Sequence, residues 1–229
     1  MCGRFVRSSS VDTFAKLFDA RGMGGLTPSY NIAPSHALLL ARNTPEGRRE
    51  LVTLYWGLVP HWSKGPDPKY SMINARADSV ATKPAYRDAF RRHRCLIAAD
   101  GFYEWKKIGR TKQPYFVRLR GGQPFAFAGL WDHWEAEGQP PIDSCTIITC
   151  DANPLVAKIH DRMPVILPPR LYDAWMDPDA RNTAALTDLL KPYPDLLMET
   201  YPVGLAVNSP KNDSAALIEP AELPPDAPE

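Results

Sequence analysis

The sequence lacks any apolar run close to the ~20 residues that cross a bilayer, and it has no hydrophobic signal segment. We therefore expect a cytoplasmic protein with no membrane partner. The net charge is only +1, which excludes a protein that coats nucleic acid by charge alone, so nucleic-acid binding would need a local basic groove. Cysteine is scarce, and the four cysteines show no CxxC pair or zinc-ligand spacing. We expect no metal, no cofactor and no disulfide framework.

Proline, in contrast, is abundant. The 24 prolines are about twice the usual share and indicate many rigid turns rather than long helices. The 229 residues, 44% hydrophobic and 23% charged, suit one compact soluble domain or two small ones. The β-leaning runs are short and do not alternate regularly with helices. We predict an α+β fold with one β-rich domain, a curved and mostly antiparallel sheet, and short flanking helices.

Local patterns place the expected elements. Apolar spacing after Ser8–Ser10 predicts a short amphipathic helix that ends at Gly22. Turn residues at 43–47 between apolar runs predict a hairpin. Residues 26–36 and 60–69 are expected to be loops, and the domain is expected to span 1–213, with a flexible Pro-rich acidic tail at 214–229. The other predicted helices cover 84–92, 153–160, 169–176 and 182–190, and the predicted strands cover 37–41, 51–56, 94–99, 114–120, 124–131, 144–149, 164–168 and 198–207.

Cys2 is the one cysteine with a separate reason to be reactive. Once Met1 is removed, it offers a free α-amine and a thiol, which titrate near pH ~8 and ~8.5 and are both partly reactive at neutral pH. Such a 1,2-aminothiol condenses with an aldehyde to an imine and then a thiazolidine, or it attacks an amide as an N-terminal nucleophile. The residue alone leaves open whether the electrophile is an aldehyde or an acyl carbon. Cys95, Cys145 and Cys150 lie in apolar stretches and are predicted to be buried.

Other candidate residues lie in separate segments. Asn74 and Arg76 are two residues apart and would project to the same face of an extended backbone. Glu104 follows an apolar run and is flanked by aromatic residues, and His160 lies between a predicted helix and a predicted strand. Trp62 ends an aromatic loop that could stack on a base. Each residue taken alone also fits an ordinary structural role, such as a turn former, a surface carboxylate, a helix cap or a core ring.

Taken together with Cys2, these segments match a specific pattern. Eight motifs occur in order: MCGRF, SYNIAPS, WGLVPHW, MINARAD, GFYEW, FAGLW, IHDRMPV and VNSPKND. The pattern resembles the SOS-response-associated peptidase family, whose members process abasic sites and crosslink to single-stranded DNA. The resemblance covers residues 2–213 and implies the fold of that family.

The resemblance also implies the chemistry. Cys2 would react with the ring-opened abasic sugar and close a thiazolidine. Glu104 would be the catalytic carboxylate, with a pKa raised by its aromatic surroundings, and His160 would be the acid–base histidine. Asn74 would orient the cysteine amine or the sugar. Met1 must first be removed, either by the same pocket acting as a cysteine-type autopeptidase or by a housekeeping aminopeptidase.

DNA contacts are implied as well. Arg4, Arg76 and Arg162 would hold phosphates with their guanidinium forks, which would supply the local basic groove. Trp62 and Pro60 would wedge or stack at the bases. The expected partner is single-stranded DNA that contains abasic sites, bound by a monomer that associates with the nucleoid on damaged DNA.

Two other interpretations compete with this one. The first is an N-terminal-nucleophile amidohydrolase of the glutaminase type, since such domains also begin with methionine followed by Cys-Gly. It leaves the other seven motifs unexplained. The second is a non-catalytic reader of modified DNA, which predicts reversible binding that survives loss of Cys2.

Overall fold

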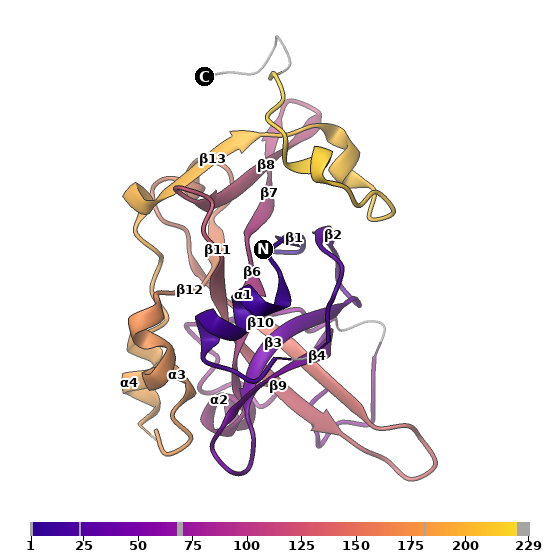
Figure 1. The fold of residues 1–229 in the computed structure, drawn as a ribbon, viewed down its shortest axis with the longest axis vertical. Helices are drawn as coiled ribbons and strands as arrows, with labels where there is room; N and C mark the ends of the chain where they lie inside the picture. The colour runs from indigo at the N-terminus through magenta and orange to yellow at the C-terminus, as the bar shows by residue number, and fades with distance from the viewer. Residues whose placement is uncertain (1, 23, 68–70, 181, 224–229) are drawn as a thin grey trace.

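Two β-sheets form the frame of the molecule, which we describe from a computed structural model for residues 2–22, 24–67, 71–180 and 182–223. The smaller sheet has five strands in the order β13-β8-β7-β1-β2, with all neighbours antiparallel (Figure 1). Its strands are β1 (Phe5–Arg7), β2 (Ser29–Ile32), β7 (Gly101–Ile108), β8 (Thr111–Leu119) and β13 (Met198–Pro202).

The larger sheet closes into a small barrel. Its central strands run in the order β4-β3-β6-β9-β10, and β10 pairs back onto β4. Each of these five strands therefore pairs with a neighbour on both sides, as closure of a barrel requires. The pairs β4–β10 and β5–β10 are parallel, whereas the other pairs in this sheet are antiparallel. The strands are β3 (Ala37–Asn43), β4 (Arg49–Trp56), β5 (Asn74–Arg76), β6 (Arg94–Ala99), β9 (Phe125–Trp134), β10 (Ile142–Asp151), β11 (Arg162–Pro164) and β12 (Ile166–Leu167).

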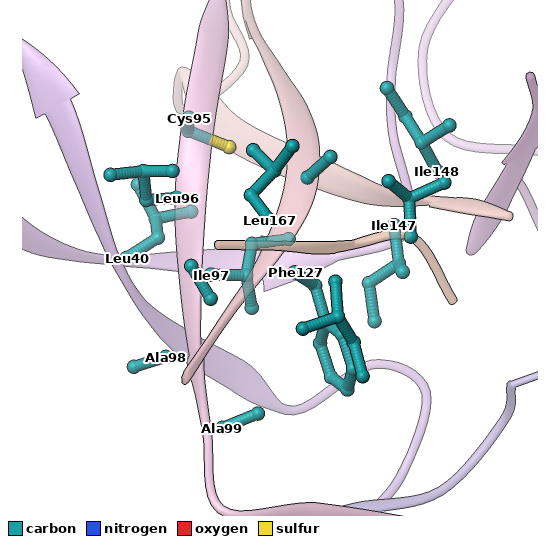
Figure 2. Packing of buried hydrophobic residues seen from close by; sticks show 14 of the residues in the cluster. Leu40, Cys95, Leu96, Ile97, Ala98, Ala99, Phe127, Ile147, Ile148 and Leu167 are labelled. Atoms are coloured by element: carbon teal, nitrogen blue, oxygen red, sulfur yellow. The ribbon is translucent and has the colours of Figure 1, made fainter. Parts of the chain in front are cut away.

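The main apolar core follows from the barrel. Leu40, Ile97, Phe127 and Ile147 come from four different barrel strands and are all buried in one cluster (Figure 2). Every residue of β6 is buried, because the helices α2 and α3 also pack against this strand. A strand that is covered on both faces has a continuous apolar sequence rather than an alternating one, which explains the run at 94–99. The predicted burial of the three internal cysteines is confirmed.

The helices are short. The predicted serine cap is confirmed, since Ser10 Oγ accepts the Thr13 N–H at 3.1 Å. The first helix ends at Asp19 rather than Gly22, because Asp19 adopts the left-handed conformation and its N–H returns to the carbonyls of the last turn. The helices are α1 (Val11–Phe18), α2 (Arg87–Arg92), α3 (Tyr172–Met176) and α4 (Thr183–Asp188), and the 3-10 turns are η1 (Val156–Lys158), η2 (Pro169–Leu171), η3 (Asp195–Leu197), η4 (Leu205–Asn208) and η5 (Ala215–Ile218).

The predicted fold class is confirmed: the chain is β-rich, with mostly antiparallel strands and short flanking helices. The hairpin around 43–47 is also confirmed, with Asn43 opposite Arg49. The prediction of a loop over 26–36 is wrong for β2, whose polar composition hid a strand that pairs with β1. Within the tail, η5 packs on the protein through Leu217, which is 4% exposed. The division of the chain at residue 213 stays a prediction, and residues 224–229 lie outside the described residues.

Candidate functional site

Pairing of β1 with β7 brings the start of the chain to Glu104. The register sets Phe5 opposite Phe102, and the Tyr103 N–H donates to the Arg4 carbonyl at 3.0 Å. Continued along an antiparallel pair, this register places residues 2–4 beside residues 103–105. Two segments that are about a hundred residues apart in the sequence therefore form one wall of the site.

The Cys2 thiol is fully buried in this wall. Burial raises the pKa of the thiol far above its usual range, and the neighbouring Glu104 carboxylate raises it further. In the chain that includes Met1, burial therefore favours the S–H form of the sulfur, and the partly ionised thiol expected after removal of Met1 stays a prediction. The Cys2 carbonyl accepts a hydrogen bond from Asn74 Nδ2 at 2.8 Å, which fixes the backbone next to the reactive atoms.

Glu104 is 2% exposed on β7. Burial raises the pKa of its carboxyl group to about 7, which confirms the direction predicted from its apolar surroundings. A carboxyl group with this pKa is present in both protonation states at neutral pH. It can accept a proton in one step and return it in the next.

The other candidate residues lie on or next to two strands that pair with β10. One edge pairs with β5, which places Asn74 opposite Ile147, and the other edge pairs with β11, which places Arg162 opposite Asp151. His160 directly precedes β11. A single strand therefore brings segments that are far apart in the sequence to its two edges, and the catalytic roles of their residues stay predictions.

The ring of His160 is held at Nδ1, to which the Arg162 N–H donates at 3.0 Å. Nδ1 also lies 2.9 Å from the Asp161 carboxylate. Burial lowers the pKa of His160, and the ring is therefore neutral at neutral pH and presents an N–H donor.

Arg76 and Arg162 are both bound by carboxylates. Arg76 Nη2 lies 2.6 Å from Asp78 Oδ2, and this pair is half-exposed. Arg162 is 8% exposed, and its Nη1 lies 2.8 Å from Asp151 and 3.8 Å from Asp78. Asp78 thus joins the two arginines into one cluster beside His160. Their contacts with DNA phosphate stay predictions, and in this structure both guanidinium groups serve intramolecular pairs.

Arg4 points toward a different segment. Its Nη1 donates to Asn31 Oδ1 at 2.8 Å and to the Val207 carbonyl at 2.9 Å, and its guanidinium lies 5.9 Å from the ring centre of Trp105. Asn31 Nδ2 in turn donates to the Asn212 carbonyl. Arg4 therefore ties β1 to the motif VNSPKND, and its predicted role in DNA binding stays untested.

Trp62 lies on the loop between β4 and β5, which lines a pocket of about 730 Å³. The indole is 55% exposed, and the ring of Tyr55 is exposed on the same pocket. Pro60 is buried, which does not favour its predicted use as a wedge. Trp56 belongs to the core and donates its indole N–H to the Ile73 carbonyl.

Sequence reasoning missed the two carboxylates that hold the arginines. Asp78 stands two residues after Arg76, and in an extended segment this spacing puts both side chains on one face. That signal was available in the sequence. Asp151 has no such local signal, because it meets Arg162 only through the pairing of β10 with β11.

The fold is a small β-barrel with an attached five-stranded sheet, and it buries Cys2 beside the carboxyl group of Glu104. The chain belongs to the SOS response associated peptidase (SRAP) family, whose family model matches residues 1–210. It is 43% identical over 223 residues to the abasic site processing protein YoaM of Bacillus subtilis, covering 96% of this chain and 98% of that protein.

More distant relatives agree with this assignment. The chain is 30% identical to the abasic site processing protein YedK of Escherichia coli, covering 96% of this chain and all of that protein. It is 34% identical to the abasic site processing protein HMCES of Gallus gallus, covering 87% of this chain and 68% of that protein. A crystal structure of a Bacteroides thetaiotaomicron protein superposes with a TM-score of 0.86 at 24% identity, over 96% of this chain and all of that one. This likeness shows the fold.

No helix within the described ranges is long and apolar enough to cross a membrane.

Proposed function

We propose that this protein processes abasic sites by forming a covalent bond between Cys2 and the ring-opened sugar in single-stranded DNA. The observation that carries the proposal is the buried Glu104, with a pKa of about 7, next to the Cys2 thiol. The names of its relatives support abasic DNA as the substrate class. The bond would shield a fragile lesion from strand breakage.

The protonation states support an order of steps. The thiol is held as S–H, so the α-amine of processed Cys2 attacks the C1′ aldehyde first. Glu104 as carboxylate accepts the ammonium proton and, once protonated, donates it to the departing hydroxyl group. One water molecule leaves and an imine forms. The sulfur then adds to the imine carbon, its proton passes to the nitrogen, and the five-membered thiazolidine closes.

The neighbouring residues suit supporting roles. His160 can exchange a proton with the ring oxygen of the closed sugar and so promote its opening. Asn74 holds the Cys2 carbonyl at 2.8 Å, which limits the positions open to the amine. Its Oδ1 is buried and has no hydrogen-bond partner among the described residues, so it is an available acceptor for that amine.

The chemistry requires loss of Met1, which lies outside the described residues. We propose that the same site removes it, with Glu104 as the proton carrier. The measurement is the intact mass of purified protein. A Glu104→Ala variant that retains Met1 while wild type loses it supports this step, and loss of Met1 in both assigns the cleavage to another peptidase.

The main test uses a single-stranded oligonucleotide with one abasic site and protein whose mass shows that Met1 is absent. On a denaturing gel we expect a heat-stable shifted band for wild type and none for Cys2→Ala. Cys2→Ser should give at most a labile imine that borohydride traps, because oxygen closes the ring less favourably than sulfur. A stable adduct with Cys2→Ala would falsify the proposal. Release of ammonia from glutamine would instead support an amidohydrolase.

A further inference from the structure

The loop that carries Trp62 has no regular secondary structure over residues 58–67. An exposed aromatic ring binds a base strongly only if its position is fixed before binding, because ordering a mobile loop costs free energy. The question is therefore what holds the loop in place. Three groups of the barrel wall bind it, and each comes from β9 or β10.

Two of these contacts lie at the ends of the segment around Trp62. The Val59 N–H donates to Ser144 Oγ at 2.8 Å, and the Ser63 carbonyl accepts the indole N–H of Trp134 at 3.0 Å. Each of these is a single neutral hydrogen bond, which contributes little to a net preference for one loop position.

The third contact is charged and lies directly beside Trp62. Asp132 on β9 accepts both the backbone N–H and the ring Nδ1 of His61 at Oδ2, each at 2.9 Å. Its Oδ1 accepts the His133 N–H at 3.0 Å, and His93 Nδ1 lies 3.4 Å from the same oxygen. The residue is 3% exposed. Both carboxylate oxygens therefore face N–H groups.

We propose that Asp132 is a positioning residue for DNA binding: through His61 it fixes the loop so that Trp62 is presented to the bases. The inference rests on the proposed function, because it requires that Trp62 contacts DNA. Asp132 touches neither Cys2 nor the acid–base residues, so it affects the affinity for DNA and leaves the chemical step unchanged.

Asparagine at position 132 replaces one of the two acceptor oxygens by an NH₂ donor, with little change in side-chain volume. Whichever way the amide is turned, its NH₂ group faces either the backbone N–H of His61 or that of His133, and the negative charge of the carboxylate is lost. Asp132→Asn therefore converts an attraction into a clash of donors. Asp143 supplies a matched control, because it binds His133 and Arg42 on the same sheet and has no contact with the loop.

The experiment measures the dissociation constant for single-stranded abasic DNA with a Cys2→Ala background, and separately the crosslinking rate at saturating DNA with Cys2 intact. For Asp132→Asn we expect affinity to fall about tenfold while the saturated rate stays within a factor of two of wild type. Asp143→Asn should match wild type in both. An unchanged affinity for Asp132→Asn, or a loss confined to the saturated rate, would overturn the inference.

His61→Phe is a second test of the inference that does not depend on correct folding of Asp132→Asn. His61 is half-exposed, so its ring can change without disturbing the core, and only the side-chain bond to Asp132 is lost. We expect an intermediate loss of affinity, about threefold. An affinity equal to that of wild type in this variant contradicts the proposed role of His61 as the link.

A double-mutant cycle shows whether Asp132 acts through Trp62. If it does, the double variant Trp62→Ala, Asp132→Asn binds DNA no more weakly than Trp62→Ala alone. Without the indole ring, the position of the loop no longer affects the affinity. Fully additive losses would contradict the inference. An unchanged affinity for Trp62→Ala alone would contradict the contact between Trp62 and DNA on which the inference rests. The covalent chemistry is tested independently by the Cys2-dependent adduct on the gel.

Discussion

At the scale of single residues, burial sets the chemistry of this site. Cys2 and Glu104 are both buried, and burial raises the pKa of each group because the charged form loses its hydration. For Cys2 the result is a thiol that burial keeps as S–H. For Glu104 the result is a carboxyl group whose pKa of about 7 lies close to neutral pH.

The same burial makes Glu104 a source of pH-dependent stability. Its pKa is about 7 in the folded protein against an ordinary value of 4.5, so between these values the folded state binds more protons. The contribution of Glu104 to the free energy of unfolding is therefore fully present below about pH 4.5. It falls as the pH rises toward 7 and stays lower above that pH. Glu104→Gln removes this fall.

We expect Glu104→Gln to match wild type near pH 4.5 and to exceed it at pH 8.5 by up to about 3 kcal/mol. Urea unfolding at both pH values measures the difference. An equal free energy of unfolding for the two proteins at pH 8.5 would show that the folded site holds the ionised carboxylate without penalty.

At the scale of elements, the site depends on short strands that sequence patterns do not reveal. β1 and β5 have three residues each, too few for a period to be recognised, yet they position Cys2 and Asn74. The longer elements, such as β6 and the hairpin of β3 and β4, were predictable because their apolar runs are bounded by turn residues. Motif resemblance supplied the candidate site residues, and strand pairing with partners far away in the sequence explains where they lie.

The C-terminal segment gives a test at this scale. Leu217 in η5 is 4% exposed, and the Tyr201 hydroxyl group donates to the Ile218 carbonyl at 3.0 Å. Leu217→Ala should therefore destabilise the protein by about 2 to 3 kcal/mol, since it leaves a cavity in the buried cluster that Leu217 forms with Val6, Tyr103 and Phe116. Leu223→Ala, at a residue that is 41% exposed, should cost less than about 0.5 kcal/mol. Equal midpoints of urea unfolding for wild type and Leu217→Ala would favour a flexible tail from residue 214.

At the scale of the whole molecule, charge is the property that composition predicted best. A net charge of +1 requires that affinity for DNA come from a few placed groups, and the structure supplies Arg76 and Arg162 in one cluster. It also shows what composition could not: Asp78 and Asp151 already neutralise part of that cluster.

The salt dependence of DNA binding tests this account. If Arg4, Arg76 and Arg162 are the phosphate contacts, log K for single-stranded DNA should fall with log salt with a slope of about −2, which is 0.7 per contact. Arg76→Gln should reduce the slope by about 0.7. Trp62→Ala should weaken binding and leave the slope unchanged, because stacking releases no counterions.

Titration of a fluorescent abasic oligonucleotide between 50 and 300 mM salt, with Cys2→Ala to prevent crosslinking, measures all three slopes. A wild-type slope of about −5 or steeper would contradict the expected contacts, because it would require cations beyond these arginines, such as Lys64 on the Trp62 loop. A Trp62→Ala slope that differs from wild type would mean that the loop carries phosphate contacts and does more than stack. The two variants thus distinguish the contribution of charge to DNA affinity from that of stacking, a distinction that neither the composition nor the fold provides.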